Sequence, residues 1–264
     1  MKILNQPLTA LKPSEIRRKI KAITFDVDGV IVPTGTYLRE NMTGTELLVK
    51  THKLSPGMIK KINQLKKHVW VNIASGRSLL YLQNMLSDIL WDRVSLIAEN
   101  GNFLLLNGKV QQLFSYNQNY FQKLTNIRQD LKKIKSQNSQ ILGFEPKHLI
   151  ITLHTKKPVP AVEKIVKKHD KEKELYCLWT SEGYDIGHKK ANKRAALKFL
   201  TKTLKINSGQ MITTGNNLND KEMLQYGLGV SMNPKKVSGK YAVPPQKDQL
   251  GGEVLVDYLL KAYQ

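Results

Sequence analysis

Short apolar runs that alternate with amphipathic segments constrain the fold of this chain more than any other feature. The run KAITFDVDGVIV breaks at Gly29, as a buried strand does where it ends in a polar loop. A helix with Ser55 as its N-cap follows, and then come a strand over 69–73 and a helix over 79–89. Such alternation favours a parallel sheet with crossover helices. We therefore predict an α/β fold with a doubly wound parallel-sheet core.

The pattern changes in the middle of the chain, where Asn100-Gly101 and Asn107-Gly108 punctuate short apolar runs in the manner of hairpins. Helical and strand patterns then alternate over 117–136, 148–155, 160–172 and 174–180. Two such β-α-β-like stretches side by side indicate an inserted α+β domain. We place this domain at 110–182, within a core formed by residues 1–109 and 183–264.

The core pattern resumes after the inserted domain. We predict helices over 192–204 and 220–227 and strands over 211–215 and 229–232. The stretch 34–54 has no clear period, and we predict a loop or flap there.

Charge and composition narrow the class of protein and of its partners. The 264 residues include 42 Lys and Arg against 21 Asp and Glu, a formal net charge of +21. This balance favours an anionic partner such as a phosphorylated metabolite, an acidic membrane or nucleic acid, but a lysine-rich proteome would produce it with no partner. No basic groove interleaved with aromatic residues supports nucleic-acid binding.

A single cysteine, Cys177, excludes an intrachain disulfide and a Cys-rich zinc module. No apolar run approaches the ~18 residues of a membrane span, and the N-terminal segment lacks the apolar core of a signal peptide. We expect a cytoplasmic protein that does not bind membranes.

Polar side chains gather where three predicted strands end. Asp26 and Asp28 follow the first strand, Ser75 the second, and the segment 216–220 a later one, while Lys193 begins the helix after the inserted domain. In open α/β sheets the carboxyl ends of strands carry the reactive groups. Two nearby carboxylates can divide the roles of nucleophile and general acid/base, and hydroxyl, ammonium and backbone N–H groups can hold a phosphoryl group. Each signal is weak alone, but their order and spacing together predict one site.

These motifs resemble those of the haloacid dehalogenase-like (HAD) superfamily, in its branch of small-molecule phosphatases with an inserted α+β cap of type C2. DVDGV resembles the first motif of that family, NIASGR the second, the region of Lys193 the third, and GNNLNDKEML the fourth. IAENGNFLLLNGK and GVSMNPKKVSGKYAV also resemble segments of that branch, so the resemblance covers almost the whole chain.

The resemblance implies a role for each matching residue. Asp26 would attack phosphorus to form an aspartyl-phosphate, and Asp28 would protonate the leaving alcohol and then activate water. Ser75, Gly76, Lys193 and Asn219 would hold the phosphoryl group. A magnesium ion would be bound by Asp26, by the backbone carbonyl of Asp28, and by Asn216 and Asp220.

Two residues depart from the pattern of the family. Val30 stands where threonine is usual, which is a minor change. Asn216 stands where the family usually has an aspartate, and an amide oxygen can bind magnesium but brings no negative charge. Asn216 therefore leaves open a second interpretation, in which the chain is a catalytically weakened binding protein that keeps the fold.

The segment GFEPKHLIITLHT resembles part of the cap of trehalose-phosphate and related sugar-phosphate phosphatases. This resemblance assigns Glu145, Lys147 and His154 to substrate binding. On a strand, Glu145 and Lys147 share a face and could both reach a sugar hydroxyl. An exposed ion pair of little energetic value is the alternative for these two residues, and an ordinary strand-end histidine is the alternative for His154.

Taken together, the sequence predicts a magnesium-dependent phosphatase that hydrolyses a small phosphate monoester, such as a sugar phosphate, through an aspartyl-phosphate. A sugar phosphomutase of the phosphomannomutase type is the enzymatic alternative, because LSPGMIKKINQLKKHVWV is reminiscent of that group. The oligomeric state does not follow from the sequence.

Overall fold

The computed structural model describes residues 4–41, 43–244 and 246–264, which divide into two compact units. The core unit consists of Met1–Thr34, His52–Leu113 and Asn192–Gln264, and the second unit of Gly35–Thr51 and Phe114–Ala191. Each unit has its own buried apolar cluster.

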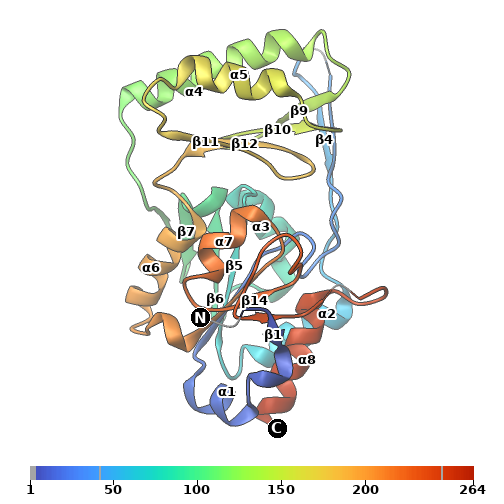
Figure 1. The fold of residues 1–264 in the computed structure, drawn as a ribbon, viewed down its shortest axis with the longest axis vertical. Helices are drawn as coiled ribbons and strands as arrows, with labels where there is room; N and C mark the ends of the chain where they lie inside the picture. The colour runs from blue at the N-terminus through green and yellow to red at the C-terminus, as the bar shows by residue number, and fades with distance from the viewer. Residues whose placement is uncertain (1–3, 42, 245) are drawn as a thin grey trace. The chain divides into compact units, whose positions relative to one another are not determined.

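The core unit is built on a nine-stranded sheet (Figure 1). In spatial order its strands are β1 (Gln6–Pro7), β15 (Tyr241–Ala242), β14 (Leu228–Ser231), β13 (Met211–Gly215), β2 (Ala22–Phe25), β5 (Trp70–Ala74), β6 (Val94–Ala98), β7 (Phe103–Leu106) and β8 (Lys109–Gln112). The first seven strands in this order are parallel to one another, whereas β7 and β8 are antiparallel to their neighbours.

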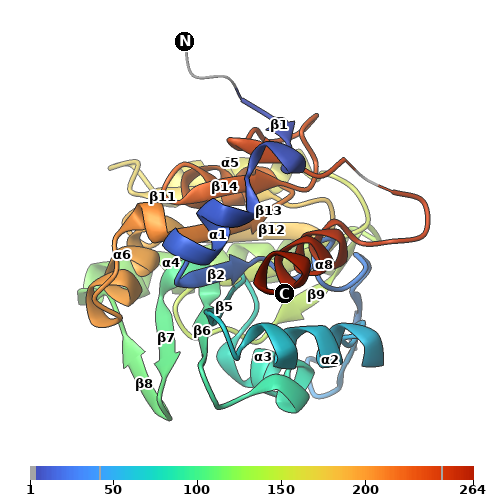
Figure 2. The same cartoon turned by 90° about the horizontal axis from the view of Figure 1, so that it is seen from below.

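Helices cover both faces of this sheet (Figure 2). Ile23 and Phe25 of β2 belong to one apolar cluster, whereas Ala22 belongs to another, because successive strand residues point to opposite faces. The first cluster includes side chains of α1 (Pro13–Lys19), α2 (Pro56–Leu65), α3 (Leu79–Met85) and α8 (Gly251–Tyr263), and the second those of α6 (Lys193–Thr203) and α7 (Lys221–Leu224). The predicted doubly wound core is confirmed.

Short 3₁₀ turns complete the core unit. They are η1 (Leu8–Ala10), η2 (Ser87–Ile89), η3 (Glu99–Gly101), η4 (Ser208–Gln210) and η5 (Leu218–Asp220). The predicted hairpin turn at Asn107-Gly108 is present between β7 and β8, with both residues at positive φ (51° and 74°). Asn and Gly tolerate this conformation better than other residues, which is why the pair marks the turn.

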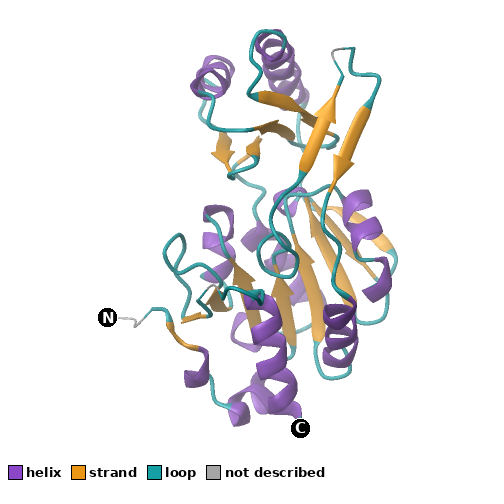
Figure 3. Cartoon of the chain, turned by 90° about the vertical axis from the view of Figure 1, so that its right-hand side faces the viewer, coloured by secondary structure: helices purple, strands orange, loops and turns teal. Residues whose placement is uncertain are grey.

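The second unit is an antiparallel sheet packed against two helices (Figure 3). Its strand order is β11 (Leu175–Trp179), β12 (Gly183–His188), β10 (Ile151–Thr155) and β9 (Ile141–Glu145), and the helices are α4 (Gln118–Lys135) and α5 (Pro160–His169). A separate hairpin, β3 (Tyr37–Glu40) and β4 (Leu47–Lys50), contacts β9 through β3. The inserted α+β architecture is therefore present.

The limits of the second unit differ from the predicted span of 110–182. That span ends just before β12, which is an inner strand of the sheet, so the compact unit continues to Ala191. It also includes Gly35–Thr51, where we predict a loop and the structure has the β3–β4 hairpin. Two four-residue strands are too short to show a clear hydrophobic period. The role of this unit in substrate selection stays a prediction.

Candidate active site

The three polar strand ends meet at one edge of the core sheet. β2 lies between β13 and β5 with both neighbours parallel to it, so the carboxyl ends of these strands are adjacent. Asp26 and Asp28 follow β2, Ser75 follows β5, and the turn 216–220 follows β13. The predicted convergence is therefore present in the structure.

Lys193 joins this group at the first residue of α6. Its Nζ donates to Asp26 Oδ1 at 2.7 Å and to Asp220 Oδ1 at 2.6 Å. All three side chains are buried. The side chain of Asn192 caps the helix by accepting from the backbone N–H of Ala195 at 2.8 Å, which fixes where α6 starts. Lys193 thus lies between two carboxylates that come from different strands.

Burial and neighbouring charges shift the pKa values of Asp26 and Lys193 in this cluster. Burial and the nearby Asp220 raise the pKa of Asp26 to about 7, although the Lys193 ammonium works against them. Burial would lower the pKa of Lys193, but Asp220 and Asp26 outweigh it and raise that pKa. Two carboxylates therefore share one ammonium, and the cluster has a formal excess of one negative charge when both are ionised. A bound cation would compensate this excess.

Asp26 also keeps one oxygen available. Its Oδ1 accepts from Lys193, while its Oδ2 forms no hydrogen bond within the part of the chain that the structure describes. A carboxylate that is oriented through one oxygen and open at the other can act as a nucleophile.

The turn after β13 orients Asp220. Its Oδ2 accepts from the backbone N–H groups of Asn216 (2.9 Å) and Asn217 (3.1 Å), while Lys193 holds its Oδ1. A Cβ at Gly215 would overlap the Asp220 side chain, so only glycine fits before this turn. Both oxygens of Asp220 are thereby held in place.

Asn216 contacts Asp28, another of the predicted magnesium ligands. The Asn216 Nδ2 donates to the backbone oxygen of Asp28 at 3.0 Å. Gly29 has a φ of +75°, and a Cβ there would overlap the Asn216 amide. The two predicted ligands are therefore hydrogen-bonded to each other, which an aspartate at position 216 could not reproduce.

Arg77 is a site residue that the sequence prediction did not include. Its Nε and Nη2 donate to the two carboxylate oxygens of Asp28 at 2.9 and 2.6 Å, and its guanidinium carbon lies 4.8 Å from the ring centroid of Tyr81. Such a bidentate pair positions a carboxylate tightly. The signal was present in the sequence, because Arg77 lies two residues after Ser75 in the strand-end segment ASGRS.

The predicted phosphate-binding residues lie around the same edge. Ser75 is buried, and its Oγ accepts from the Arg77 backbone N–H at 3.2 Å. Gly76 follows Ser75 in the bend after β5, and Asn219 lies half-buried in η5. Their assignment to phosphate binding stays a prediction.

In the second unit, Glu145 forms a buried cluster with two basic groups. Its Oε1 accepts from Lys147 Nζ at 2.6 Å, and its Oε2 is 3.0 Å from His154 Nε2. Burial would raise the pKa of Glu145, but Lys147 and His154 outweigh it and lower that pKa to about 2. Because the pair is buried, an exposed ion pair is the wrong description. β9 ends at Glu145, so Lys147 reaches it from the following loop and not from a shared strand face.

A second polar pair lies beside this cluster and was also not predicted. Thr152 Oγ1 donates to Asp185 Oδ1 at 2.6 Å. The strand register places Thr152 opposite both Glu145 on β9 and Asp185 on β12. Residues opposite each other point to the same face, so Glu145, Thr152 and Asp185 form one polar row across three strands.

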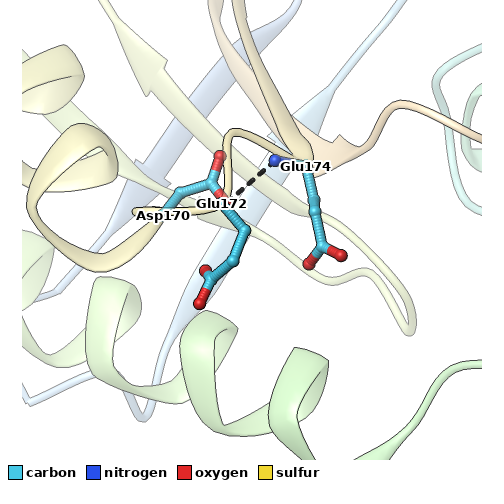
Figure 4. A group of neighbouring side chains, drawn as sticks. All are labelled: Asp170, Glu172 and Glu174. Atoms are coloured by element: carbon cyan, nitrogen blue, oxygen red, sulfur yellow. Dashed lines mark hydrogen bonds between the residues drawn. The ribbon is translucent and has the colours of Figure 1, made fainter.

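Three acidic residues elsewhere in the second unit are close enough to suggest a metal site (Figure 4). Asp170, Glu172 and Glu174 come from the turn between α5 and β11, and Asp170 Oδ1 accepts from the Glu174 backbone N–H at 3.1 Å. However, Lys123 Nζ already lies 2.7 Å from Glu172 and 2.9 Å from Glu174. This cluster is therefore an ion-pair network around a lysine.

Comparisons with known proteins agree with this architecture. Residues 109–238 match the model of a family described as haloacid dehalogenase-like hydrolase. This range includes Lys193, Asn216 and Asp220, while the first two motifs precede it. A search of curated proteins by sequence finds no match.

Solved structures share the fold over nearly the whole chain. The C-terminal domain of a C. albicans trehalose-6-phosphate phosphatase aligns with a TM-score of 0.70 at 16% identity, covering 99% of this chain and 97% of that one. A HAD-superfamily phosphatase, BT1666 from Bacteroides thetaiotaomicron, aligns with a TM-score of 0.62 at 16% identity, covering 93% and 96%. A protein from Thermoplasma acidophilum aligns with a TM-score of 0.65 at 16% identity, covering 92% and 100%. At this level of identity the likeness establishes the fold alone.

Among the described residues, no helix combines the length and the apolar character that crossing a bilayer requires. The matched family model, the doubly wound core with its inserted α+β unit, and the four motifs in order give one consistent result. Residues 109–238 thus match the haloacid dehalogenase-like hydrolases, and nearly the whole chain shares the fold of a solved phosphatase of that superfamily.

Proposed function

We propose that this protein is a magnesium-dependent phosphatase that hydrolyses a small phosphate monoester through an aspartyl-phosphate. The observation that carries the proposal is the buried Lys193, which bridges Asp26 and Asp220 from two neighbouring strand ends. An ammonium in this position orients a nucleophilic carboxylate and stabilises the anionic phosphoryl group that it attacks.

The residues at the strand ends fit a magnesium ion. Magnesium prefers oxygen ligands and retains waters, and the carboxylates of Asp26 and Asp220, the Asp28 carbonyl and the Asn216 amide offer oxygen. The excess negative charge of the Lys193 cluster also favours a cation. When bound, the ion would neutralise charge on the phosphoryl oxygens.

In the proposed reaction, an Asp26 oxygen attacks phosphorus while the bond from phosphorus to the ester oxygen breaks. Asp28 donates a proton to the departing alcohol. Asp28 then accepts a proton from a water that attacks the aspartyl-phosphate, which releases inorganic phosphate and restores Asp26. Arg77 donates one hydrogen bond to each Asp28 oxygen, so a second lone pair on each oxygen remains for the proton.

We further propose a sugar phosphate as the substrate, acted on in the cytoplasm, with Glu145, Lys147 and His154 selecting its alcohol part. Their buried network offers both donors and acceptors, as polyol binding requires. The name of the C. albicans neighbour, a trehalose-6-phosphate phosphatase, agrees with this substrate class.

An assay of the purified protein tests the reaction type. Incubation with an aryl phosphate and with a panel of sugar phosphates, with and without Mg²⁺, should release inorganic phosphate only when the metal is present. Isomerisation of a hexose phosphate without phosphate release would instead identify a phosphomutase. Binding without either reaction would identify the catalytically weakened alternative that Asn216 suggests.

A ratio of rates tests the substrate assignment. Replacing Lys147 by Met should lower kcat/KM for the best sugar phosphate at least ~10-fold more than for the aryl phosphate, because contacts remote from phosphorus serve specificity. Lys164→Met, on the exposed face of α5, is the matched control. An equal loss on both substrates would assign Lys147 to the stability of the second unit.

A further inference from the structure

The β3–β4 hairpin exposes large apolar side chains. Tyr37, Leu47 and Leu48 are 50%, 39% and 46% exposed. β4 pairs with β3 alone among the described strands, so its other edge presents unpaired backbone groups. An exposed strand edge of this kind is a template for pairing with another strand.

The register of the hairpin determines which backbone groups point outward. The Asn41 backbone N–H donates to the Glu46 oxygen at 3.1 Å, so Asn41 and Glu46 form a hydrogen-bonded pair. Hydrogen-bonded and non-hydrogen-bonded pairs alternate along an antiparallel ladder. The N–H and C=O groups of Leu48, two residues after Glu46, therefore also point toward β3. The N–H and C=O groups of Leu47 and Val49 therefore point away from the hairpin.

The sequence of this edge, Glu46-Leu-Leu-Val-Lys50, is complementary to itself in the antiparallel direction. With Leu48 on a twofold axis, Leu47 faces Val49 of a second copy, and each of these pairs can exchange both backbone hydrogen bonds. Glu46 then faces Lys50 of the second copy, on both sides of the axis. A shift by two residues would pair the same backbone groups but would remove both charge pairs.

We propose that this protein forms a twofold dimer through antiparallel pairing of β4 with β4 of a second copy, centred on Leu48. Neither the Glu46 nor the Lys50 side chain forms an ion pair or a hydrogen bond in the described part of the chain, so both are available. Four-residue strands bury little area, so we expect a weak dimer with a Kd of about 10–100 µM. The inference is independent of the proposed function.

Charge reversal tests the register. Sedimentation equilibrium from about 1 to about 500 µM should show wild type passing from monomer to dimer. Glu46→Lys and Lys50→Glu should each raise Kd ~10-fold or more, because symmetry turns both charge pairs into like-charge pairs. The double variant E46K/K50E should restore the wild-type Kd. Glu163→Lys and Lys164→Glu, exposed on α5, are the matched controls and should leave Kd unchanged.

Cross-linking tests the position of the axis. Residues of a non-hydrogen-bonded pair have Cα atoms about 4.5 Å apart, which suits a disulfide. In a Cys177→Ser background, Leu48→Cys should form a disulfide-linked dimer under mild oxidation, and Val110→Cys, on the exposed strand β8 of the core unit, should not. A wild-type protein that is monomeric throughout the range overturns the proposal. A dimer that neither single reversal weakens also overturns it. The same holds if the double variant fails to restore the wild-type Kd, or if cross-linking at position 48 is no faster than at position 110.

Discussion

The two units each contain a buried cluster of carboxylate and lysine side chains, and the clusters have opposite charge balance. In the core unit, Lys193 is shared by Asp26 and Asp220. In the second unit, Glu145 is shared by Lys147 and His154. Both clusters are desolvated, yet the pKa of Asp26 rises to about 7 while that of Glu145 falls to about 2. Burial raises the pKa of both carboxyl groups, and the two basic partners of Glu145 explain why its pKa alone ends below the ordinary value.

This difference separates two kinds of chemistry. A cluster with excess negative charge favours a cation and holds a carboxylate that can attack an electrophile. A cluster whose single carboxylate is paired on both oxygens is stable without a ligand and presents fixed polar groups. We therefore expect the Asp26 cluster to carry out the reaction and the Glu145 cluster to recognise the substrate.

The largest effect is expected for Asp26→Asn, which should reduce kcat for an aryl phosphate by more than about 10⁴-fold, because an amide is a poor nucleophile. The variant should still fold. In the metal-free protein the pKa of Asp26 is raised, so ionisation of Asp26 lowers the free energy of unfolding above neutral pH. The variant should thus melt at or above the wild-type temperature at about pH 8.

Asp88→Asn is the matched control, since it makes the same chemical change on an exposed residue. It should leave both kcat and the melting temperature unchanged. Substantial turnover by Asp26→Asn would exclude the covalent route.

The next largest effect is expected for Asp28→Asn, because general acid/base assistance contributes about 10²–10⁴ in rate. This change also disturbs the bidentate pair with Arg77. Arg77→Gln separates the two contributions, because it removes the partner and leaves the carboxylate. We expect Arg77→Gln to lower kcat clearly less than Asp28→Asn does. Equal losses would indicate that the Asp28–Arg77 pair has a structural role.

Most of the core site could be predicted from the sequence, for a reason that its residues make clear. Asp26, Ser75 and Asp220 each follow an apolar strand, and parallel strands bring their ends to one edge. The segment ASGRS places Arg77 near this edge, but its pairing with Asp28 depends on side-chain reach, which no local pattern reports.

The second unit was less predictable. The row formed by Glu145, Thr152 and Asp185 depends on strand register, which is a tertiary property. Asp185 also lies on β12, whose sequence GYDIGH has two glycines and no continuous apolar run. The hydrophobic pattern therefore predicts a domain boundary before this strand.

A smaller effect, on stability, should distinguish the two clusters by the sign of their pH dependence. Glu145 has a folded-state pKa of about 2 against an ordinary value of 4.5, so it stabilises the fold above pH 4.5 and loses this contribution as the pH falls toward 2. Glu145→Gln should thus lower the free energy of unfolding at pH 7 by about 3 kcal/mol, with the gap narrowing on acidification.

Urea unfolding at a series of pH values measures this gap. Asp26→Asn should show the opposite trend, because a raised pKa makes the wild-type contribution fall as the pH rises from 3.8 to about 7. Glu163→Gln, an exposed residue on α5, controls for general acid effects. Parallel slopes for the Glu145 and Asp26 variants would contradict the proposed difference between the clusters.

The smallest effect concerns Asn216, where the chain departs from the pattern of the family that it resembles. Asn216→Asp removes the hydrogen bond from Nδ2 to the Asp28 carbonyl and so frees that oxygen, while the backbone N–H of residue 216 can still hold Asp220. It also adds a negative charge beside two carboxylates, which mutual repulsion disfavours without metal. With magnesium bound, attraction to the cation should prevail, since charge on the ligands tunes the affinity of oxygen sites.

We therefore expect Asn216→Asp to bind Mg²⁺ up to about tenfold more tightly in isothermal titration, with a lower melting temperature when the metal is removed. Asn217→Asp is the matched control, because it adds the same charge one residue further along and keeps a good helix cap. A similar gain from both variants would indicate a general field effect. Equal or weaker binding by Asn216→Asp would mean that position 216 is not a ligand, and the excess charge of the core cluster would then rest on Asp26 and Asp220 alone.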